Sequence, residues 1–129
     1  MRAPLAVILL AALAGSAAPA ASRQDPLDRE LGGRIAGTPV DCVDNSRLMG
    51  PQVIDDRTIL YRESGLRTWR NDLPESCPGL RPNTVLIVNV YGSQLCRNDR
   101  VRTIDPGSII PGPTCRLGKF TPYDKPRKK

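Results

Sequence analysis

The chain has 129 residues, with 19 Lys and Arg against 13 Asp and Glu, which gives a formal charge of +6. It contains no histidine, and this excludes Ser-His-Asp and Cys-His catalysis as well as histidine-ligated metal sites. The length suits a single small domain.

The first 20 residues have the layout of a secretory signal peptide. Arg2 supplies a positive start, residues 5–13 form an apolar core, and Ala18-Pro19-Ala20 fits a cleavage site, with Ala20-Ala21-Ser22 as an alternative. A retained membrane anchor is the competing interpretation, but it needs about 20 apolar residues. With no cysteine beside the cut to carry a lipid, we predict a periplasmic or secreted protein without a membrane span.

Residues 21–33 are predicted to be a flexible lead-in that contains one short helix. Asp25 can cap the helix, Pro26 suits its first position, and Gly32 and Gly33 end it. One or two turns are marginal alone, so the helix depends on contacts with the rest of the chain.

Residues 34–121 are predicted to form a single β domain that begins with a meander. Its arms are residues 52–54, 58–62 and 66–70, which are rich in β-branched and aromatic side chains. Turn chemistry separates the arms at Asp55-Asp56-Arg57 and at Glu63-Ser64-Gly65. The adjacent aspartates could instead form an acid/base or cation site, but in a strand they would point to opposite faces. We expect Ile59, Tyr61 and Trp69 to face the core.

The second half of the chain continues as strands. Residues 74–82 form a proline-rich connection, and the apolar run 85–90 indicates a central strand covered on both faces. Residues 100–105 alternate, and 108–120 form a broken edge. The predicted fold is mainly β: a small antiparallel sheet or curled barrel of about six short strands, stapled by disulfides, with one short N-terminal helix.

Four cysteines in an exported chain indicate two disulfides, for which three connectivities exist. A zinc site is the alternative, but it would need a shorter spacing between two of the thiolates. We favour Cys42–Cys115 and Cys77–Cys96. The first would tie the opening strand to the end of the domain, and the second would clip the ends of one long strand.

Residues 122–129 are predicted to be a disordered basic tail. Its four cations account for most of the charge, because a chain without Arg2 and this tail carries only +1. They can contact an anionic surface weakly, although a merely solvated end is the simpler interpretation. No aromatic residue accompanies them, so specific nucleic-acid binding is not predicted. These cations are Lys125, Arg127, Lys128 and Lys129.

No catalytic, cofactor-binding or metal-binding residue is predicted. The glycine pair lacks the context of a phosphate-binding loop, and the calcium-loop pattern is missing. Carboxylate chemistry remains open in principle. The available acids, most of which read as turn residues, are Asp44, Asp55, Asp56, Asp72, Glu75, Asp99 and Asp105.

Five segments together resemble a family of short exported proteobacterial proteins known only as a domain of unknown function. They are GRIAGTPVDCV, VIDDRTILYR, LPESCPGL, SQLCRND and CRLGKF, and the likeness spans residues 33–120 with all four cysteines. The resemblance implies an envelope location and a compact cysteine-bridged domain. It assigns no activity, so no catalytic residue is carried over.

These observations favour a non-enzymatic exported binding or structural domain whose partner is an unknown envelope component or protein. Two alternatives stay open. One is an inhibitor of a hydrolase that presents the loop 74–82, and the other is a small carboxylate-dependent enzyme that acts on a cell-wall component.

Overall fold

The computed structural model describes residues 25–129, so the predicted signal peptide lies outside the described residues. Within this range are one α-helix, a 3-10 turn and ten strands, and no helix is long and apolar enough to cross a bilayer. The elements are α1 (Pro26–Leu31), β1 (Ile35–Ala36), β2 (Cys42–Asp44), η1 (Asn45–Arg47), β3 (Pro51–Val53), β4 (Thr58–Arg62), β5 (Arg67–Asp72), β6 (Val85–Val88), β7 (Gln94–Cys96), β8 (Arg100–Ile104), β9 (Thr114–Arg116) and β10 (Phe120–Asp124).

The strands form three antiparallel sheets, which confirms the predicted fold class. The largest is open and has the order β1-β10-β5-β4-β3, a second joins β2 to β7, and a third has the order β6-β8-β9. The predicted number of about six strands was too low. Several of the additional strands are only two or three residues long, too short to leave a pattern in the sequence.

The predicted meander β3-β4-β5 and both of its turns are confirmed. At the first turn, the Asp55 carboxylate accepts the Arg57 backbone N–H at 2.9 Å, so this residue shapes a corner. At the second turn, the Ser64 hydroxyl accepts the N–H groups of Leu66 and Arg67 at 3.2 and 3.1 Å. Ile59, Tyr61 and Trp69 are all buried, as expected.

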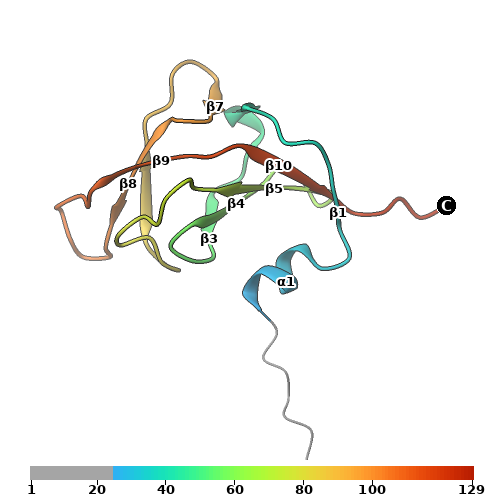
Figure 1. The fold of residues 1–129 in the computed structure, drawn as a ribbon, viewed down its shortest axis with the longest axis horizontal. Helices are drawn as coiled ribbons and strands as arrows, with labels where there is room; N and C mark the ends of the chain where they lie inside the picture. The colour runs from blue at the N-terminus through green and yellow to red at the C-terminus, as the bar shows by residue number, and fades with distance from the viewer. Residues whose placement is uncertain (1–24) are drawn as a thin grey trace, which may run out of the picture.

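The main core lies between the three sheets, and β4 passes through the best-covered position. Ile59 and Tyr61 belong to the main core, and Tyr61 stacks at a tilt on Phe120 with 5.9 Å between ring centroids. Leu60 points to the other face and packs with Leu31 of α1. Figure 1 shows α1 beneath the large sheet. The short helix therefore has a packing reason to form.

The expectation of a central strand at residues 85–90 was wrong. Strand β6 has only β8 as a neighbour, and Val85 and Ile87 are 56% and 37% exposed. Strand β4 is buried on both faces instead, because α1 covers the second face of its sheet. An apolar run is compatible with either position until the neighbouring layers are known.

Both disulfides form, but the favoured pairing was wrong. Cys42 is bonded to Cys96, and Cys77 to Cys115. The chain does not run straight from Cys77 to Cys96. It turns back near Tyr91 and sends β7 to pair with β2, and this register sets Cys42 directly opposite Cys96. Two disulfides fit an exported protein.

The tail also begins later than predicted, because residues 122–124 belong to β10. This strand lies between β1 and β5 in the large sheet, and Phe120 at its start is fully buried. Pro122 cannot donate a hydrogen bond, but its carbonyl still accepts the Gly37 N–H at 2.8 Å. Regular structure ends at Asp124, directly before the basic residues.

Candidate anion-binding groove

A groove of about 570 Å³ lies where the β4–β5 turn, η1 and the end of β10 meet. A smaller cavity of about 230 Å³ adjoins it and shares Arg47, Glu63 and Arg67. Five cations and two acids line the larger groove, which gives it a net charge of +3. These residues are Arg47, Arg67, Lys125, Arg127, Lys128, Glu63 and Asp124.

The basic tail is fixed to the groove at its first residue. The Lys125 N–H donates to the Leu66 carbonyl at 2.9 Å, which holds the tail against the β4–β5 turn. Lys125, Arg127 and Lys128 then line the groove, whereas Lys129 does not. The structure therefore brings three of the four predicted tail contacts together with arginines from elsewhere in the chain.

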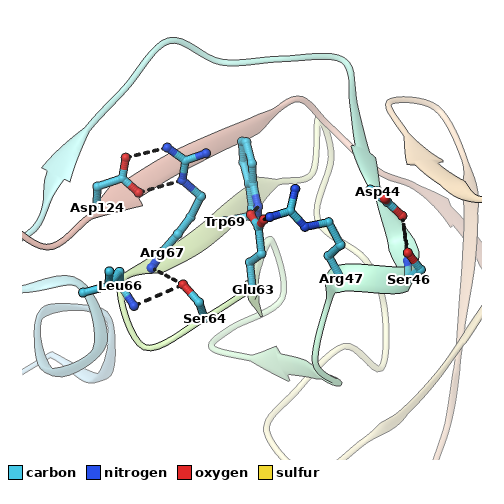
Figure 2. A network of polar contacts seen from close by, with 9 residues as sticks. All are labelled: Asp44, Ser46, Arg47, Glu63, Ser64, Leu66, Arg67, Trp69 and Asp124. Carbon is cyan, nitrogen blue, oxygen red and sulfur yellow. Dashed lines mark hydrogen bonds and ion pairs between the residues drawn. The ribbon is translucent and has the colours of Figure 1, made fainter.

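Arg67 of β5 is held in a fixed position at the floor of the groove. Its Nε and Nη2 donate to the two Asp124 carboxylate oxygens, each at 2.7 Å, and its guanidinium lies 5.3 Å from the centroid of the Trp69 ring (Figure 2). Hydrogen bonding to Asp124 raises the pKa of Arg67, and hydrogen bonding to Arg67 lowers the pKa of Asp124. Both groups therefore stay charged in neutral solution.

Glu63 connects the floor of the groove to η1. Its Oε2 accepts the Trp69 indole N–H at 2.7 Å, and its Oε1 lies 3.0 Å from Arg47 Nη2 (Figure 2). Arg47 ends the short η1 turn, which begins with Asp44 accepting the Ser46 N–H and hydroxyl at 3.0 and 2.6 Å. These hydrogen bonds from Ser46 lower the pKa of Asp44. Both acids thus position neighbouring groups.

Acidification should destabilise the folded state through Asp124. The lowered pKa means that the unfolded chain binds a proton that the folded chain refuses, so the free energy of unfolding rises with pH in this window. The contribution is present above the unfolded pKa of about 3.9 and is lost as pH falls through the lower folded value. The pair is nearly half exposed, so we expect only about 0.5 kcal/mol.

Urea denaturation between pH 6 and pH 2 measures this effect. Asp124→Asn should remove part of the acid-induced loss, with Asp41→Asn as a control at a more exposed ion pair. Equal pH slopes for the wild type and Asp124→Asn would contradict the assignment.

The other candidate acids are spread over turns and ion pairs and do not converge. Asp56 accepts the Ser76 hydroxyl, and Asp99 accepts the Cys96 N–H at 2.7 Å. Asp72 and Asp105 pair with Arg70 and Arg81. Within residues 25–129, no group of three or more His, Cys, Asp or Glu side chains could hold a metal ion.

The chemistry of the groove suits charge binding better than proton transfer. Asp124 is held ionised, so it has no proton to donate near neutral pH. Burial raises the pKa of the Tyr61 phenol far above neutrality, so this group stays protonated. Arginine and lysine donors around an open groove recognise phosphate or carboxylate oxygens without a titration step.

The sequence revealed only the tail half of the groove. Arg47, Glu63 and Arg67 were not singled out, because each reads as an ordinary solvated residue of a turn or strand. The only signal in their favour is the charge alternation around Trp69, which does not distinguish a groove from an exposed strand.

The fold and the groove define a disulfide-linked antiparallel β domain with a basic surface site. The chain belongs to a family of unknown function (DUF6491), whose model matches residues 1–129. No curated protein and no solved structure matches it significantly.

Proposed function

We propose that this protein is a non-enzymatic periplasmic or secreted domain that binds phosphate-bearing groups of an envelope component in the basic groove. The observation that carries the proposal is the convergence of cations from η1, β5 and the tail on one groove. A tail that merely kept the chain soluble would not need an anchor beside these arginines.

The cations of the groove divide into a fixed and an available set. Arg67 is paired with Asp124, and Arg47 with Glu63. Within residues 25–129, Lys125, Arg127 and Lys128 form no ion pair, although all three are charged and exposed. The available set supplies the excess charge, and the fixed set supplies a rigid wall.

Isothermal titration with tripolyphosphate, a soluble probe with several phosphate groups, tests the proposal. Lys128→Glu should weaken binding about threefold to fivefold, and Arg127→Glu with Lys128→Glu about tenfold or more, since each reversal costs roughly 0.5–1 kcal/mol. Binding should also weaken as salt rises, because the contacts are exposed.

Adjacent lysines provide a matched control. Lys129→Glu makes the same charge change one residue beyond the groove, and Arg29→Glu with Lys129→Glu matches the double variant. These controls should lose no more than about twofold. If they weaken binding as much as the groove variants do, the net charge and not the groove is responsible, and the proposal fails. It also fails if the wild type does not bind.

A further inference from the structure

The outer face of the β6-β8-β9 sheet combines arginines with exposed aliphatic side chains. Alternation along β8 buries Val101 and Thr103 and turns Arg100 and Arg102 outward, as predicted. In register with them on the same face are Ile87, opposite Arg102, and Arg116, opposite Arg100. This face lies on the far side of its sheet from the core.

The three arginines of this face, Arg100, Arg102 and Arg116, have no acidic partners. Among residues 25–129 none of the three forms an ion pair, whereas Arg81 and Arg97 nearby pair with Asp105 and Asp41. Arg100 and Arg116 stand directly opposite each other, and like charges in that position repel. An anion bound at this face would relieve the repulsion.

The loop between β8 and β9 presents two isoleucines at the edge of the same face. Ile109 and Ile110 are 92% and 77% exposed. The loop is held in shape, because the Gly112 N–H donates to the Thr103 carbonyl at 2.7 Å and Arg102 Nε donates to the Gly112 carbonyl at 3.0 Å. A fixed loop that exposes two adjacent large aliphatic residues is typical of an interaction site.

We propose that this face docks on an anionic phospholipid bilayer. Ile109 and Ile110 enter the boundary between head groups and acyl chains, and Arg100, Arg102 and Arg116 contact lipid phosphates. The isoleucines protrude from a loop and do not line a groove, so they suit a fluid medium that closes around them better than a rigid protein surface.

The spacing along β8 fits this arrangement. Arg102 lies two residues before Ile104, the last residue of the strand ahead of the loop, or about 7 Å along the strand. The polar layer of one leaflet is on the order of 5–8 Å thick. With the loop tip at the acyl boundary, Arg102 is therefore at the depth of the head groups, where a cation is attracted to anionic lipid.

This surface is separate from the groove. Figure 1 places β8 and β9 at the end of the molecule opposite to the C-terminus, which follows the groove-lining tail residues. The docking proposal does not rest on the proposed function, and the two can fail independently.

Co-sedimentation with large unilamellar vesicles tests the docking. The full mature chain should bind vesicles of 30% phosphatidylglycerol in phosphatidylcholine and should bind pure phosphatidylcholine at least tenfold more weakly. Ile109→Ser with Ile110→Ser should weaken binding at least about tenfold, and Arg100→Gln with Arg116→Gln by a similar factor, since each cation near an anionic surface contributes about fivefold.

Exposed residues elsewhere supply matched controls. Ile35→Ser with Met49→Ser removes two other exposed apolar side chains, and Arg29→Gln with Lys129→Gln removes two other charges. Both controls should bind within about twofold of the wild type. Tryptophan emission of Ile109→Trp should shift to the blue on anionic vesicles, which reports insertion directly.

Three results would overturn the docking proposal. They are a wild type that ignores anionic vesicles, loop variants that bind as well as the wild type, and an unchanged emission of Ile109→Trp. Arg127→Glu with Lys128→Glu separates the two sites. If vesicle binding is lost there and kept in the loop variants, the groove is the membrane contact and the docking face is not.

Discussion

Asn71→Ala should lower the free energy of unfolding by about 3 kcal/mol. Asn71 is fully buried on β5, where its Nδ2 donates to the Gly118 carbonyl and its Oδ1 accepts the Gly118 N–H, each at 2.8 Å. Truncation leaves both backbone groups of Gly118 buried without their partner, at about 1–3 kcal/mol each, and adds a small cavity. Urea denaturation at constant slope measures the change.

The control for this variant is Asn89→Ala, an exposed asparagine whose side chain makes no hydrogen bond to residues 25–129, and it should change stability by less than about 0.5 kcal/mol. Gly118 cannot adjust to compensate, because a Cβ there would meet the Asp72 carbonyl at 1.9 Å. A loss below about 1 kcal/mol for Asn71→Ala would show that water replaces the amide, contrary to the proposed lock.

Removing either disulfide should cost about 4 kcal/mol. The Cys42–Cys96 bridge spans 54 residues and the Cys77–Cys115 bridge 38, and loop-closure entropy predicts similar contributions for these lengths. Cys42→Ser with Cys96→Ser, and Cys77→Ser with Cys115→Ser, should each unfold at much lower urea concentration than the oxidised wild type. In a small domain, this is a large share of the stability.

Non-reducing peptide mapping checks the pairing on which this prediction depends. The wild type should yield a Cys42 peptide joined to a Cys96 peptide. A Cys42–Cys115 product would contradict the structure. The mixed variant Cys42→Ser with Cys115→Ser should be less stable than either matched pair, because it breaks both bridges and leaves two unpaired thiols.

Local signals predicted the parts of the fold that local chemistry decides. The corner at Asp55 follows from an aspartate that bonds a backbone N–H two residues on, and the helix α1 follows from its cap and its proline. The burial of Trp69 follows from the size of the side chain. In each case, the residues that make the structure are within a few positions of one another.

The parts that could not be predicted depend on distant contacts. The exposure of β6 follows from its edge position, and the partner of Cys42 follows from the pairing of β2 with β7, about 50 residues away. The groove was half visible for the same reason. The tail cations are contiguous, but Arg47 and Arg67 join them only because β10 returns beside β5.

The order of the two bridges has a consequence for survival outside the cell's own quality control. The spans 42–96 and 77–115 interleave, so every peptide bond between residues 42 and 115 is enclosed by at least one of them. A single protease cut in any exposed connection, including the one with Ile109, leaves the two fragments covalently joined. A nicked molecule should therefore run as one species until a reductant separates its halves.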